Sequence, residues 1–358
     1  MRNKIIILLI LLPSFSFGQY GYGFLKEYFF GRQNSARAEA MGKSYASIDG
    51  DLTTAYFNPA GVATIQGLEM SGSHASPYYL LEKAKYNFVG VGYKIKDYLT
   101  FGLNRRNFDY GEGLFTNNTG NIINQRKSFI SNYCLTIASQ PIKNIFIGLN
   151  SNYHYWQIAD IETNTFYWDL GVIKKFNLSQ KETRQQSVNV GTSLLNINGA
   201  KVVFKEFGNT NKSPLPIILR IGANYQINFQ EKIIIDTLNT LTFLLQGEYQ
   251  DVVNSKYESA IRSGVEIMLL EILSIRAGYY KEYGYDNGIP SVNYDQISAF
   301  TYGFGIQVPL YKLTKIPLNI NLDYTSLPQQ PYSNYNYNLD NFTTFNVRLN
   351  WLIKNKTP

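Results

Sequence analysis

The sequence predicts an all-β transmembrane protein: a 14-stranded antiparallel outer-membrane β-barrel with a short N-terminal helical plug. Apolar and polar residues alternate with a period of two along most of the chain after residue 68, as expected for strands with one face to lipid and one to a polar lumen. Aromatic residues make up 15% of the chain, beside only 16% charged residues. The N-terminus has the composition of an export signal. A large soluble β-sandwich or β-helix is the competing interpretation.

Residues 1–18 have the three parts of a secretory signal peptide. Two basic residues precede an apolar run over 5–12, and the expected cut lies between Gly18 and Gln19. The run is much shorter than the about 20 residues that a spanning helix needs. Without the two basic residues the formal net charge falls from +7 to +5, and no Lys/Arg block is present, so no nucleic acid is expected as a partner.

Residues 19–67 are expected to form a lead-in and then the plug. From residue 35 the sequence has a helical composition, passes a glycine to a second short helical piece, and closes on Asn-Pro-Ala-Gly over 58–61. Proline cannot donate a backbone hydrogen bond, so we expect the plug segment to stop there. The residues expected to define the plug are Arg37, Met41, Gly42, Asp49, Asp51, Asn58, Pro59, Ala60 and Gly61.

Residues 68–358 are expected to form the barrel. Most of the fourteen alternating segments have the about 9–11 residues, or a few more, that a tilted spanning strand needs. The segments are 69–79, 84–94, 98–107, 128–139, 144–156, 163–176, 186–196, 215–229, 239–250, 257–268, 271–281, 297–308, 316–326 and 341–352. Links at one end are mostly long and polar and links at the other mostly short, as predicted for a barrel whose N-terminus starts in the periplasm. The links 177–185 and 230–238 are longer than this pattern predicts.

The charged residues of the later segments fall on one side of the alternation. A charge facing lipid at mid-depth costs about 2–4 kcal/mol, so we expect this side to face the lumen. The lumen charges are Arg220, Glu248, Arg262, Glu266, Arg276, Asp323 and Arg348. Their signs are mixed, so they can pair with one another or hold Arg37, Glu39, Asp49 and Asp51 of the plug. A structural lattice and an anchor for a ligand or protein both remain open.

No residue pattern predicts catalysis or a metal site. A single cysteine, Cys134, excludes an intrachain disulfide and, with only His74 and His154, leaves no zinc or haem arrangement. Neither histidine adjoins a nucleophile motif. Asp160 and Glu162 are expected in an outer loop, either solvated or in contact with Ca²⁺. We therefore expect no enzyme, no cofactor and no metal.

Five short motifs are distributed over the expected plug and the last third of the chain. They are SARAEAMG over 35–42, AYFNPAG over 55–61, IRSGVEI over 261–267, IRAGY over 275–279 and NLDY over 321–324. Together they resemble the PorV/PorQ-type outer-membrane proteins of the wider FadL-like barrel superfamily.

The resemblance implies a location in the outer membrane of a Bacteroidetes-type bacterium and one of two functions. The first is a component of type IX protein secretion that binds a translocon subunit and secreted cargo proteins. The alternative is a passive channel for hydrophobic small molecules. A purely structural or adhesive role is a third hypothesis, and outer-membrane lipid is the expected surrounding in every case.

Overall fold

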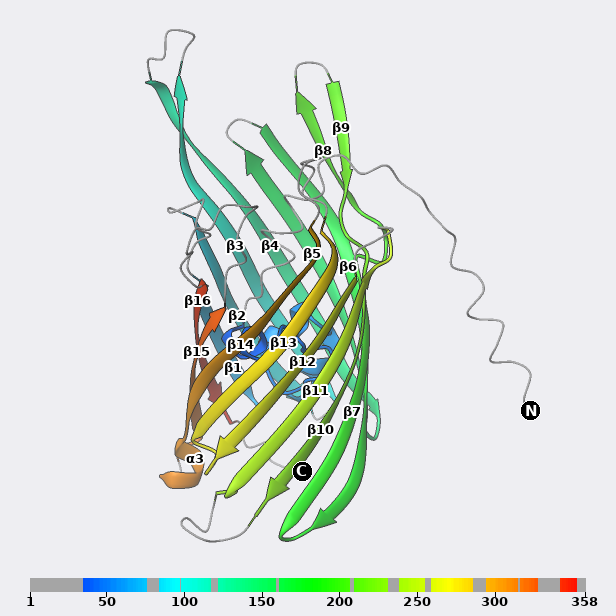
Figure 1. The fold of residues 1–358 in the computed structure, drawn as a ribbon, viewed down its shortest axis with the longest axis vertical. Coiled ribbons are helices and arrows are strands. Elements are labelled where there is room, and N and C mark those ends of the chain that lie inside the picture. Colours follow the sequence, from blue (N-terminus) through cyan, green and yellow to red (C-terminus); the bar gives the residue numbers. More distant parts are fainter. Residues whose placement is uncertain are drawn as a thin grey trace, which may run out of the picture.

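The protein is a closed barrel of fourteen antiparallel strands, which confirms the predicted fold class (Figure 1). The computed structural model describes residues 35–75, 84–96, 98–116, 122–158, 161–206, 209–230, 238–254, 259–285, 294–314, 316–327 and 342–352. The expected signal peptide and lead-in lie outside these residues. Within them, no helix combines the length and apolar character needed to span a membrane.

Every predicted segment overlaps one barrel strand. The strands are β1 (Leu68–Ala75), β2 (Lys85–Lys96), β3 (Leu99–Thr116), β4 (Ile122–Ile142), β5 (Ile145–Ile158), β6 (Ile161–Lys181), β7 (Arg184–Leu195), β10 (Ile218–Phe229), β11 (Leu241–Val252), β12 (Ser259–Leu269), β13 (Leu273–Tyr285), β14 (Tyr294–Pro309), β15 (Leu318–Leu327) and β16 (Phe342–Trp351). Each strand pairs with its neighbour along the chain, and β1 pairs with β16 to close the ring.

The two ends of the barrel differ. At one end, which we call the turn end, β6 and β7 are joined by residues 182–183 alone, because β6 is longer than predicted. The link 177–185 therefore consists mostly of strand. The short helix α3 (Leu310–Leu313) also lies at the turn end (Figure 1). At the other end, the loop end, β3 and β4 extend well beyond the predicted segments to 18 and 21 residues.

A hairpin covers part of the loop end. The connection over 197–214, expected as a polar loop, contains β8 (Lys201–Glu206) and β9 (Asn209–Pro214). These two strands pair only with each other and form a separate two-stranded sheet. The alternation rule missed them because each of the two strands has only six residues and the connection around them is polar.

Side chains lie on the predicted sides of the strands: one parity, meaning every second residue of a strand, faces outward, and the other parity faces the lumen. Ile221, Leu245 and Phe304 point outward and are about half exposed, at 47%, 51% and 49%. Arg220 and Glu248, on the opposite parity, are buried. These outward side chains give the outer surface the apolar character that lipid requires, and these two charges lie inside.

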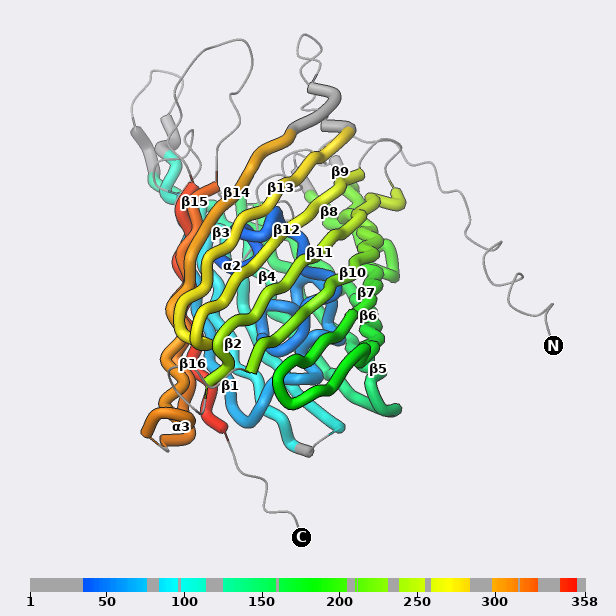
Figure 2. The backbone as a smooth tube through the Cα atoms, turned by 60° about the horizontal axis from the view of Figure 1, so that its bottom comes forward, coloured from blue at the N-terminus to red at the C-terminus, as the bar shows by residue number. Residues whose placement is uncertain are grey.

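The plug lies inside the barrel, where it is drawn in blue in Figure 2. It consists of α2 (Ala36–Ala40), η3 (Leu52–Tyr56) and η4 (Pro59–Thr64). Side-chain oxygens of Ser35 and Asp51 accept hydrogen bonds from the first turns of α2 and η3 and so cap these helices.

The expectation that the plug segment stops within residues 58–61 is wrong. Pro59 is the first residue of η4, and Asn58 caps it by accepting a hydrogen bond from the Ala60 backbone N–H at 3.1 Å. A proline at the first helical position loses only an N–H that would have no helical partner, so it starts this helix.

Candidate functional site: the plug and the lumen

Arg37 joins the plug to the wall. Its guanidinium donates to Glu266 on β12 at 2.7 Å and lies 3.7 Å from Asp51 of the plug. Asp51 also pairs with Arg348 on β16 at 3.2 Å. Burial alone would raise the pKa of the Asp51 carboxyl. The positive charges of Arg348 and Arg37, together with hydrogen bonds from Tyr45 and other plug groups, outweigh burial and hold this pKa below its ordinary value. Asp51 is therefore ionised at neutral pH.

The same chain of charges continues along the wall. Arg276 on β13 contacts Glu266 and pairs with Asp323 on β15 at 2.7 Å. Glu69 on β1, which the sequence reasoning did not single out, accepts a hydrogen bond from the Leu52 backbone N–H at 2.7 Å. Positive and negative groups alternate along the ion pairs of this chain, so each charge that takes part in them contacts an opposite one.

Glu248 on β11 is the centre of a second cluster. Its carboxylate accepts hydrogen bonds from the backbone N–H groups of Tyr45 and Ala46 at 2.7 and 2.8 Å. It also pairs with Arg220 and Arg262, each at 3.1 Å. One buried carboxylate therefore binds the plug backbone and forms ion pairs with two wall arginines.

Two further groups complete this cluster. Arg262 pairs with Glu282 on β13 at 3.0 Å, and Lys43 of the plug pairs with the same carboxylate at 3.4 Å. Burial lowers the pKa of Lys43 below its ordinary value, and Glu282 opposes this effect. The seven predicted lumen charges thus all lie inside the barrel, and they both pair with one another and hold the plug.

The opposite side of the plug is apolar. Leu52, Val62 and Ile65 belong to one buried cluster with Phe88 and Ile173 of the wall. Next to it, the Asn58 amide donates to the backbone carbonyls of Ala46, Val172 and Thr192 at 2.7–3.3 Å. The plug is therefore held by ion pairs on the side of β11 to β16 and by apolar packing on the side of β2 to β6.

Glycines of the wall let the plug backbone come close. A Cβ added at Gly264 would lie 2.5 Å from the Met41 carbonyl oxygen, and one added at Gly278 would overlap Gly42. Gly42 has φ = 66°, a conformation that favours glycine, and its N–H donates to Thr301 at 3.0 Å. Glycines on the other side of the barrel, Gly148 and Gly171, make the same close approach to Pro59 and Asn58.

The remaining plug residues have local roles. Asp49 accepts a hydrogen bond from Asn189 of β7 at 3.3 Å. Ala60 is buried in the apolar cluster, and the Gly61 carbonyl accepts the Gly50 N–H at 3.0 Å. All nine predicted plug residues therefore lie within the lumen.

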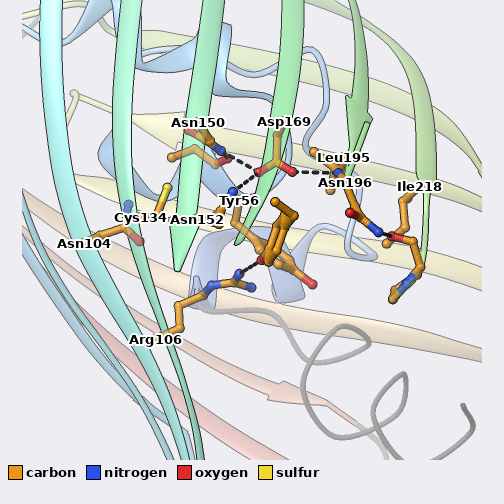
Figure 3. Close-up of a pocket in the computed structure, with 13 residues that line it drawn as sticks. Tyr56, Asn104, Arg106, Cys134, Asn150, Asn152, Asp169, Leu195, Asn196 and Ile218 are labelled. Carbon is orange, nitrogen blue, oxygen red and sulfur yellow. Dashed lines mark hydrogen bonds between the residues drawn. The ribbon is translucent and has the colours of Figure 1, made fainter. Parts of the chain in front are cut away.

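The sequence reasoning missed a second polar centre, whose side chains Figure 3 shows. Arg106 on β3 donates to Tyr167 at 3.3 Å and lies 4.1 Å from the ring centre of Tyr56 in the plug. Asp169 on β6 accepts hydrogen bonds from Asn150 and Asn152 at 2.9 and 2.8 Å. A cavity of about 20 Å³ lies among them, enough for about one water molecule. Applying the parity rule to 98–107 and 163–176 would have placed both charges inside.

An apolar cluster lies inside the loop end. Its wall residues include Tyr86, Phe108, Ile130 and Trp156 from four successive strands, β2 to β5. Val202 of the β8–β9 hairpin is fully buried against it. The lumen of an outer-membrane barrel is ordinarily polar, so this aromatic and aliphatic interior is a special feature of the loop end.

The two histidines and the cysteine do not form a catalytic arrangement with one another. The imidazole of His74 lies 2.7 Å from the Asn87 amide oxygen, His154 is fully buried, and Cys134 is a buried free thiol. Glu162 is exposed at the start of β6, and Asp160 lies outside the described residues. In the described part of the chain, no three His, Cys, Asp or Glu side chains are placed to hold a metal ion.

Three solved structures are similar to this one over most of its length. The toluene transporter TodX of Pseudomonas putida has 11% sequence identity and a TM-score of 0.48, with 88% of this chain and 97% of that chain covered. A FadL homologue of Pseudomonas aeruginosa has 9% identity and a TM-score of 0.47, with 90% and 98% covered. The toluene transporter TbuX of Ralstonia pickettii has 8% identity and a TM-score of 0.47, with 90% and 99% covered.

No family model and no curated protein matches this chain. The PorV/PorQ-type resemblance of the motifs in the plug and in the last third of the chain therefore stays a hypothesis from the sequence. The barrel itself, with its apolar outer face and its charged lumen, is of the outer-membrane type.

Proposed function

We propose that the protein binds small hydrophobic molecules at its loop end and passes them across the outer membrane, without catalysing a reaction. The apolar cluster inside the loop end is the observation that supports this function. Ligand sites for apolar molecules are lined mainly by aromatic and aliphatic side chains, and this cluster offers both.

Two closures control such a path. The β8–β9 hairpin buries Val202 in the cluster but pairs with no barrel strand, so it can lift without breaking the wall. Below the hairpin, the plug fills the lumen. For a molecule to pass, the plug must move away from the wall on its charged side or on its apolar side. The structure then corresponds to the closed state of a passive channel.

Two aspartate substitutions on the hairpin test this proposal. Val202→Asp places a charge in the cluster, whereas Val203→Asp changes the adjacent, partly exposed residue. We expect Val202→Asp to abolish saturable binding of a fluorescent apolar probe to the purified barrel and its uptake by cells, and Val203→Asp to preserve both. Equal behaviour of the two variants would contradict the proposed binding site.

A second candidate function is a docking component of type IX protein secretion that binds a translocon subunit and cargo. The firmly held plug favours it, because Glu248 and Arg37 fix the plug to the wall as a static scaffold would require. Crosslinking in intact outer membranes tests it. Recovery of a translocon subunit or of secreted cargo supports docking, and normal surface display of cargo after deletion of the gene argues against it.

A further inference from the structure

A second cavity lies at the turn end, beside the plug and opposite the apolar cluster. It measures about 200 Å³ and is formed by β10, β11, β12 and β14 together with Arg37 of α2. At about 30 Å³ for each water in the liquid, its volume corresponds to roughly seven water molecules. That is about the size of one six-membered sugar ring.

The charges of this cavity are already neutralised by the protein. Glu266 is bound by Arg37 and by Arg276. Glu271 is bound by Lys312. A charged ligand would find no unpaired opposite charge here and would lose its own hydration, so the cavity does not favour an ion.

Three uncharged polar side chains of the cavity have no hydrogen-bond partner in the part of the chain that the structure describes, whereas Gln226 donates to Asn228 at 2.9 Å. The side chains of Asn239, Thr242 and Gln307 line the cavity and make no hydrogen bond to another described residue. An amide offers donors and an acceptor, and a hydroxyl offers both as well. An apolar ligand would leave these groups without water or a partner, at about 1–3 kcal/mol for each.

We propose that this cavity binds a neutral sugar, with the ring hydroxyls or an N-acetyl group hydrogen-bonded to Asn239, Thr242 and Gln307. The apolar side chains of Leu244 and Met268, which also line the cavity, would contact the C–H groups of the ring. The site is independent of the proposed transport function. It could receive either a free monosaccharide or one unit of a longer glycan.

The methionines of the chain allow a direct test. The chain has four methionines, and Met268 alone of Met41, Met70 and Met268 lines the cavity. Met70 faces lipid, at 54% exposure, and Met41 is buried in the plug, so both serve as internal references. The protein is labelled with methyl-¹³C methionine and held in a detergent without a sugar headgroup.

N-acetylglucosamine, glucose and an N-acetylglucosamine trimer are titrated separately, with cyclohexanol as an apolar ring of similar size. We expect at least one of the sugars to shift the Met268 methyl resonance saturably, with a Kd on the order of 1 mM, and the Met70 resonance to stay in place. A stronger response to the monosaccharide than to the trimer assigns a free sugar, and the reverse assigns a glycan. No saturable shift with any sugar, or an equal shift with cyclohexanol, overturns the proposal.

Substitutions confirm the assignment. Gln307→Leu and the near-isosteric Thr242→Val should each weaken sugar binding several-fold, while Gln186→Leu on β7, outside the cavity, should leave it unchanged. Unchanged Met41 and Met70 resonances show that each variant is folded. Undiminished binding in both cavity variants contradicts the proposed contacts.

Discussion

Replacing Glu248 with glutamine should release the plug on its charged side. The variant keeps the size of the side chain but removes the charge that pairs with Arg220 and Arg262, each at 3.1 Å. Arg262 retains Glu282 at 3.0 Å, whereas Arg220 keeps no carboxylate among the described residues. Removing one partner of a buried ion pair costs about 3–5 kcal/mol, so we expect a loss of that size in the free energy of unfolding.

Urea unfolding in lipid vesicles, followed by tryptophan fluorescence, measures this loss. Glu112→Gln is the matched control, because Glu112 pairs with Lys127 at 3.7 Å on the exposed part of β3, where an ion pair contributes little. We further expect Glu248→Gln to raise single-channel conductance in planar bilayers, since the plug is less firmly held. A stability change below about 1 kcal/mol, equal to that of the control, would refute the reasoning that this carboxylate fixes the plug.

Three other outcomes follow from the same contacts. The Asp51 pKa is depressed by Arg348 and Arg37 despite burial, so its contribution to stability is complete well above the ordinary pKa of 3.8 and is lost as pH falls through the lower folded value. The unfolding free energy should fall more steeply below pH 4 in the wild type than in Asp51→Asn. Gly278→Ala places a methyl group into the plug backbone and should destabilise by about 1–3 kcal/mol. Gly247→Ala, whose Cβ has 3.9 Å of room, should be near neutral in the same urea assay, and equal effects of the two glycine variants would contradict the close approach. Arg37→Met should raise the plug's accessibility to protease, and unchanged digestion would contradict its role as the link between plug and wall.

Much of the fold could be predicted because the information is local. A strand with one face to lipid must alternate, and a charge such as Arg220 or Glu248 can only occupy the inner parity. The partners could not be predicted, because strand tilt and register decide them. Arg37 and Glu266 are separated by 229 residues in the chain, and no rule about sequence spacing predicts that they come into contact.

Two features of the structure were not predicted from the sequence, for different reasons. The β8–β9 hairpin is short and polar, so it resembles an ordinary loop until its Val202 is seen inside the barrel. Arg106 and Asp169 lie in the first half of the barrel, apart from the charges and motifs of the last third of the chain, and no local motif marks either residue. The end of the plug was misjudged because a proline can start a helix as well as stop one.

The pairing of the first strand with the last has a consequence for biogenesis. The plug precedes all fourteen strands in the chain, yet its contacts run from β1 to β16, and the ring closes only when Trp351 has come to lie opposite Leu68. Because the wall encloses the plug on all sides, we expect the sheet to curl around a plug that is already in place, so that the N-terminal segment serves as a template for assembly as well as a stopper.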